Sequence, residues 1–171
     1  MMASIQTLLR SLLQREDDLA VLLSDLNRTL YSCSTPERYS TLFCGVISKD
    51  RRSLTYVNAG HVQPLLLHAD GELERLPGDG LPIALLPEAS YEQTTVALRP
   101  GDLLVVVSDG IVEACNVNGE FWEEEEVERV VLEHVDCATH GLPGELCAAV
   151  DAFAGDAEQY DDMTVVAVRV V

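Results

Sequence analysis

The chain has 171 residues, of which 29 are acidic and 11 are Lys or Arg, so its formal net charge at pH 7 is −18. This charge disfavours nucleic acid and anionic membrane surfaces as partners, because both would be repelled. An apolar content of 47% is enough for a buried core, and no apolar run is long enough to cross a bilayer. The start lacks the basic-then-apolar layout of a secretory signal, so we expect a cytoplasmic protein.

The cysteine pattern points the same way. An odd number of cysteines without a C-x-x-C pair is typical of reduced thiols in a cytoplasmic protein and disfavours zinc. We expect most of these thiols to be buried. The five residues are Cys33, Cys44, Cys115, Cys137 and Cys147.

Two amphipathic helices are predicted at the start of the chain. Leucine and isoleucine recur at helical spacing over residues 5–13 and again over residues 19–30. An acidic break separates the two segments, and Asp17 or Asp18 is expected to cap the second helix.

The apolar period changes to that of strands from Thr41 onward. Polar turns separate three pairs of predicted strands, namely residues 41–48 with 53–58, 65–67 with 73–76, and 93–98 with 102–108. Two helices, 122–135 and 143–153, and a closing strand, 165–171, complete the chain. This order predicts an α+β layered domain with an antiparallel sheet.

Aspartates stand beside two of these apolar strands. Residues 103–107 run directly into Ser108-Asp109-Gly110, and Asp161-Asp162 precedes the closing strand. If the two strands are antiparallel neighbours, Asp109 and Asp161 fall on the same edge of the sheet. Converging carboxylates repel each other unless a cation lies between them, and hard oxygen ligands suit Mg²⁺ or Mn²⁺. Taken alone, each motif is explained more simply as a turn.

Two loop motifs are also candidates for a functional site. Asn58-Ala59-Gly60-His61 permits a tight bend with the polar side chains of Asn58 and His61 at its rim, although a plain turn explains it equally and spacing alone does not make His61 a general acid. Residues 78–82, Gly-Asp-Gly-Leu-Pro, place a carboxylate in a flexible loop. This loop approaches a site or is a solvated connection, and the second interpretation is preferred.

Taken together, the motifs resemble those of the PPM-type metal-dependent protein phosphatases, in the bacterial SpoIIE/RsbU branch. Five segments occur in the order and spacing of that family over the whole chain. They are Asn58-Ala59-Gly60-His61, Gly80-Leu81-Pro82-Ile83-Ala84, Pro100-Gly101-Asp102, Ser108-Asp109-Gly110-Ile111-Val112-Glu113-Ala114 and Asp161-Asp162-Met163-Thr164. One position departs from the family pattern, because Ala84 stands where the family generally has glycine.

The resemblance implies a fold, a cofactor and a reaction. The fold would be an αββα sandwich forming a single domain over residues 1–171, with a two-metal Mg²⁺ or Mn²⁺ centre at one end of its sheets. The reaction would be hydrolysis of phosphoserine or phosphothreonine by a metal-activated water, on a phosphorylated regulatory protein of the anti-sigma-factor antagonist type. By the same resemblance Asp109 and Asp161 are metal ligands, and Asp162 completes the metal site by orienting Asp161 or by reaching a metal-bound water.

Part of the family pattern is not present in this sequence. The family's first metal motif, Gly-Asp-x-x-Asp, and its Asp-Val-x-Gly-Lys-Gly segment do not occur, and the resemblance would place both upstream of the helix over residues 1–14. We therefore expect a domain without its opening strands, with weak metal binding, poor catalysis, and an unpaired sheet edge that favours a homodimer or aggregation. The alternative hypothesis is a non-catalytic, phosphatase-like binding module.

Overall fold

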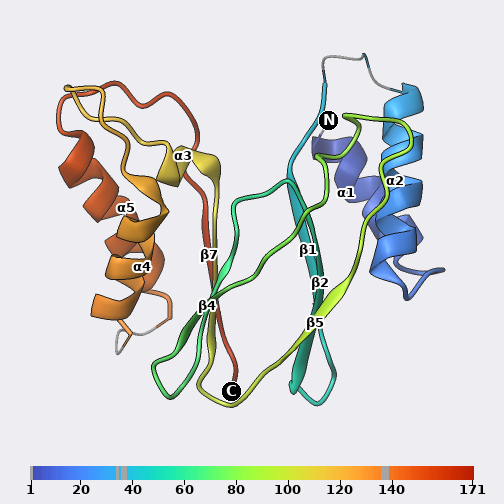
Figure 1. Cartoon of the computed structure of the whole chain (residues 1–171), viewed down its shortest axis with the longest axis horizontal. Helices are drawn as coiled ribbons and strands as arrows, with labels where there is room; N and C mark the ends of the chain where they lie inside the picture. Colours follow the sequence, from blue (N-terminus) through green and yellow to red (C-terminus); the bar gives the residue numbers. More distant parts are fainter. Residues whose placement is uncertain (1, 34, 36–37, 136–138) are drawn as a thin grey trace. The chain divides into compact units, whose positions relative to one another are not determined.

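The computed structural model describes residues 2–33, 35, 38–135 and 139–171. The chain divides into two compact units, residues 1–61 with 77–98 and residues 62–76 with 99–171. In chain order, the elements are α1 (Met2–Leu12), α2 (Leu19–Cys33), β1 (Leu42–Ile47), β2 (Ser53–Ala59), β3 (Leu65–Leu67), β4 (Leu73–Arg75), β5 (Thr94–Ala97), β6 (Leu103–Val107), α3 (Asp109–Val112), α4 (Glu123–Glu133), α5 (Leu142–Ala154) and β7 (Val165–Arg169) (Figure 1).

The first unit is a three-stranded antiparallel sheet in the order β1-β2-β5, with α1 and α2 on one face (Figure 1). As predicted, Asp18 caps α2, and its side chain accepts hydrogen bonds from the backbone N–H of Ala20 at 2.8 Å and of Val21 at 3.2 Å. The apolar stripe of α2 is buried in one core with Val57 and Ala59 of β2. The buried leucines of that stripe are Leu19, Leu22, Leu23, Leu26 and Leu30.

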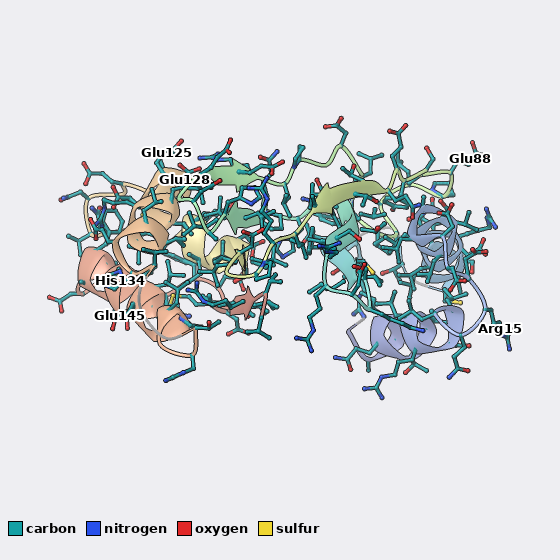
Figure 2. The ribbon with its side chains drawn as sticks, turned by 90° about the horizontal axis from the view of Figure 1, so that it is seen from below. Arg15, Glu88, Glu125, Glu128, His134 and Glu145 are labelled. Atoms are coloured by element: carbon teal, nitrogen blue, oxygen red, sulfur yellow. The ribbon has the colours of Figure 1, made fainter. Side chains whose placement is uncertain are left out.

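The second unit is a four-stranded antiparallel sheet in the order β4-β3-β6-β7. Helices α4 and α5 cover one face, and their buried residues share a core with β3 and β6 (Figure 1). Arg75 of β4 forms ion pairs with Glu124 and Glu128 of α4. At the junction of α4 and α5, Nε2 of His134 lies 3.7 Å from a carboxylate oxygen of Glu145 (Figure 2).

The α+β prediction is confirmed, since each unit contains one sheet and one helical layer. The structure differs from the simplest interpretation at the Arg99–Gly101 turn, because the strands on either side of it belong to different sheets: β5 pairs with β2, whereas β6 pairs with β3 and β7. The sequences of the two strands explain this. The apolar strand β6 is mostly buried in the centre of its sheet, whereas the threonine-rich β5 is largely exposed at an edge.

Two composition-based expectations can be compared with the structure. In the part of the chain that the structure describes, no helix is long and apolar enough to cross a membrane. The four described cysteines are free thiols, but Cys33 is exposed and Cys44, Cys115 and Cys147 are only half-buried. The expectation that most of the thiols are buried is therefore wrong for these four, and Cys137 lies outside the described residues.

Candidate metal centre at the edge of the second sheet

The pairing of β6 with β7 decides where the conspicuous aspartates lie. The two strands are antiparallel, with Val107 opposite Val165. The pairing continues past the strand ends, because the backbone N–H of Ser108 donates to the carbonyl of Thr164 at 3.0 Å and the N–H of Thr164 donates to Oγ of Ser108 at 2.9 Å. The segments that carry Asp109 and Asp161 therefore meet at one edge of the sheet, as the sequence predicts.

Gly110 allows these two segments to approach each other closely. A Cβ atom at this position would lie 2.5 Å from the carbonyl oxygen of Asp162, which is closer than real Cβ contacts permit. The same carbonyl accepts a hydrogen bond from Oγ of Ser108 at 3.0 Å. Glycine is therefore required at position 110 for packing, and Ser108 holds the Asp162 backbone against the start of α3.

The three candidate ligands are exposed aspartates. One carboxylate oxygen of Asp109 accepts a hydrogen bond from the N–H of Gly110 at 3.0 Å, and one of Asp161 accepts from the N–H of Asp162 at 2.7 Å. For the second oxygen of each, the structure gives no hydrogen-bond partner among the described residues. Such oxygens suit Mg²⁺ or Mn²⁺ chemically. Within the same part of the chain, however, no three His, Cys, Asp or Glu side chains gather closely enough to hold a metal, so the three aspartates do not form a closed cage.

The Asn58–His61 turn, which belongs to the first unit, is built differently from the prediction. Oδ1 of Asn58 accepts a hydrogen bond from the N–H of His61 at 2.8 Å, and Nδ2 of Asn58 donates to the carbonyl of His61 at 3.0 Å. Asn58 is buried, and Gly60 between them adopts a φ of +73°, which favours glycine. Asn58 therefore holds the turn together from inside and does not stand at its rim.

The glycine-rich loop 78–82 packs on this turn. Gly80 forms a parallel bridge with Ala59, and a Cβ atom on either Gly78 or Gly80 would overlap Asn58. Gly78, Asp79 and Leu81 are exposed, as the preferred interpretation of a solvated connection predicts, and the backbone of the loop is in close contact with the Asn58–His61 turn. A polar cavity of about 360 Å³ opens beside it, and its wall includes Glu92, which no sequence motif had indicated.

Asp102 of the Pro100-Gly101-Asp102 motif lies at the other end of β6 and is fully buried. Its carboxylate accepts hydrogen bonds from the N–H of Arg99 at 2.8 Å, from the N–H of Ala69 at 2.9 Å, and from Nδ1 of His68 at 3.2 Å. Burial opposes ionisation, but these three hydrogen bonds outweigh it and lower the pKa of Asp102. This motif therefore stabilises a turn and does not contribute to the candidate metal centre.

Comparisons with known proteins agree with this fold. The chain is 28% identical over 133 residues to protein IcfG of Synechocystis, covering 76% of this chain and 20% of IcfG. It is 26% identical over 149 residues to the phosphoserine phosphatase RsbU of Bacillus subtilis, covering 86% of this chain and 44% of RsbU. A solved structure of the SpoIIE phosphatase domain of B. subtilis, from manganese-presoaked material, has a TM-score of 0.67 at 23% identity and covers 97% of this chain and 73% of that one.

The fold is therefore that of the PPM-type, or PP2C-type, phosphatase domains. The model of the family described as stage II sporulation protein E (SpoIIE) matches residues 1–171, and the chain belongs to that family. It spans less than half the length of the curated relatives IcfG and RsbU.

Proposed function

We propose that this chain is the catalytic part of an Mn²⁺- or Mg²⁺-dependent phosphatase that hydrolyses phosphoserine or phosphothreonine on a bacterial regulatory protein of the anti-sigma-factor antagonist type. The observation that carries the proposal is the meeting of the Asp109 and Asp161–Asp162 segments at the β6–β7 edge. Two relatives support it. RsbU is a phosphoserine phosphatase, and the structure of the SpoIIE phosphatase domain comes from manganese-presoaked material.

In this proposal Asp109 and Asp161 hold the cation through their second carboxylate oxygens, and Asp162 supports them. A bound divalent cation neutralises phosphate oxygens and lowers the pKa of water to near neutrality. The other residues of the site hold these carboxylates in place. Hydrogen bonds between Ser108 and Thr164 fix the backbone on both sides of the edge, and Gly110 allows the two segments to lie in contact.

The test measures hydrolysis of a phosphoserine peptide against Mn²⁺ concentration. The protein is this chain, alone and fused to an opening segment that bears the Gly-Asp motif of the family. We expect Mn²⁺-dependent turnover in the fused protein, and a loss of about 100-fold or more in Asp109→Asn and Asp161→Asn. Each change keeps the side-chain shape but removes the anionic oxygen, so kcat and metal affinity should fall together.

A matched control is available in the loop that leads to β7. Asp156 is an exposed carboxylate of that loop outside the candidate site, and Asp156→Asn should leave turnover unchanged. An Asp109→Asn variant with full activity would overturn the proposal. The alternative, a non-catalytic phosphatase-like binding module, predicts that the chain alone and the fused protein both bind the peptide without Mn²⁺-dependent hydrolysis.

A further inference from the structure

The second unit contains a cavity that the metal chemistry does not need. It measures about 510 Å³ and lies between the segment after α3, the C-terminal end of α5 and the loop leading to β7. Its wall includes the apolar side chains of Ala114, Val150, Ala154 and Met163. A largely apolar hollow of this size is typical of a binding site.

Two aromatic side chains stand on the wall of this cavity with much of their surface in solvent. Phe121 is 59% exposed and Tyr160 is 84% exposed. Aromatic side chains left in water contribute little to folding, whereas they are the usual anchors of protein recognition sites. Their position indicates that the cavity receives part of another molecule.

The charge of the cavity selects the kind of molecule. Four carboxylates line it, and its described wall contains no Lys, Arg or His; the four are Glu113, Asp151, Glu158 and Asp161. Carboxylates gathered around a hollow repel one another, and a cationic side chain of a bound partner relieves that repulsion. The chain as a whole carries a net charge of −18, which adds to the attraction for a basic segment.

The cavity is continuous with the candidate metal centre. Gly110, which packs against the Asp162 carbonyl, and Asp161 both belong to its wall. A molecule with its phosphate group at the metal centre therefore has its neighbouring atoms at the mouth of the cavity. Because the wall is apolar and acidic, it suits the residues beside a phosphoserine and not the phosphate itself.

We infer that this cavity binds the segment of the substrate protein that flanks the phosphorylated residue, and that it selects an apolar side chain accompanied by a Lys or Arg. The position of the phosphate rests on the proposed function, but the preference of the cavity itself does not. The apolar side chain enters the hollow between Phe121 and Tyr160, and the basic side chain meets the carboxylates around it.

The experiment measures the binding of fluorescein-labelled, unphosphorylated peptides by fluorescence anisotropy. One peptide carries adjacent Leu and Lys at its centre, and the other carries Ser and Glu in the same scaffold. We expect the Leu-Lys peptide to bind at least about 10-fold more tightly, with the preference falling as salt is added. Tyr160→Ala and Phe121→Ala should each weaken it several-fold, and the double change Glu113→Gln with Glu158→Gln should remove most of the preference for Lys.

Val117 provides the matched control. It is 70% exposed and lies between Cys115 and Phe121, but it does not line the cavity, so Val117→Ala should bind both peptides as the unchanged protein does. Because all five substituted side chains are exposed, folding should be preserved, and circular dichroism checks this directly. Equal binding of the two peptides, or a Tyr160→Ala and Phe121→Ala pair without effect, overturns the inference.

Phosphorylated versions of the same peptides separate this inference from the proposed function. If the unphosphorylated pair shows the preference but no Mn²⁺-dependent hydrolysis of the phosphorylated pair occurs in the fused protein, the phosphatase proposal fails and the cavity inference stands. If both phosphorylated peptides are hydrolysed with the same kcat/KM, the cavity inference fails and the phosphatase proposal stands.

Discussion

At the scale of single residues, Asn27 of α2 fixes the loop that follows the Gly80–Ala84 motif. Its Oδ1 accepts hydrogen bonds from the N–H of Ala84 at 2.8 Å and from the hydroxyl of Tyr91 at 3.3 Å, and its Nδ2 donates to the carbonyl of Leu86 at 2.9 Å. Asn27 is fully buried, and burial raises the pKa of Tyr91 to about 12. A buried side chain with this many partners holds the loop on α2.

Ala84 shows what the departure from the family's glycine means physically. Its φ of +67° lies in the left-handed region, which costs an L-residue about 1–2 kcal/mol relative to glycine. The methyl group is buried and contributes about 0.8 kcal/mol. The loop therefore keeps a conformation that favours glycine, and alanine is tolerated because its methyl group is packed in the core.

The first prediction compares two buried alanines of the same unit. Ala84→Gly relieves the left-handed strain while losing a buried methyl, so its free energy of unfolding should change by less than about 1 kcal/mol. Ala59→Gly in β2 loses its methyl without relief and should cost about 1.5 kcal/mol. Urea denaturation measures both. Equal losses in the two variants would contradict the strain argument.

At the scale of elements, the turn before β6 is organised by the buried carboxylate of Asp102 and the imidazole of His68. Nε2 of His68 also lies 3.5 Å from a carboxylate oxygen of Glu74 in β4. Burial alone would lower the pKa of His68, but the hydrogen bonds and negative charges of Asp102 and Glu74 outweigh it and raise that pKa. His68, paired with Asp102, therefore links β4 to the turn that precedes β6.

The second prediction is the pH dependence of this pair. His68 has a raised pKa in the folded protein, so its contribution is complete below about pH 6.5 and is lost as the pH rises through the folded value. Asp102 has a lowered pKa, so its contribution is present above about pH 3.9 and is lost as the pH falls through the folded value. The pair should therefore stabilise the fold most between about pH 4 and pH 6.5.

Thermal unfolding over a pH series measures this effect. His68→Gln should flatten the fall in stability above about pH 6.5, whereas His140→Gln, which changes an exposed histidine, should leave the fall unchanged. If the two variants had the same pH profile, the His68–Asp102 pair would not be the cause.

At the scale of the whole molecule, local patterns predicted every element except the short helix α3, and one long-range feature, the edge shared by Asp109 and Asp161. That feature was predictable because two apolar strands flanked by aspartates have one simple antiparallel arrangement. The sheet to which β5 belongs could not be predicted, because the turn residues Arg99–Gly101 fit both a hairpin and a crossing between two sheets. The apolar cavity was also not predictable, because its wall joins residues near 114, 150 and 160 that no motif connects.

The last prediction concerns association through an edge strand. Among the described strands, β1 pairs only with β2, and its outer end carries Val46 and Ile47, which are 45% and 38% exposed. An unpaired row of backbone groups beside exposed apolar side chains favours pairing with a second copy. We expect sedimentation velocity to show concentration-dependent association, and Val46→Lys to shift the protein toward monomer, because a charge on the edge disfavours strand addition. Val117→Lys adds the same charge outside any strand and should leave association unchanged. If the unaltered chain stays monomeric at every concentration, this edge does not mediate assembly.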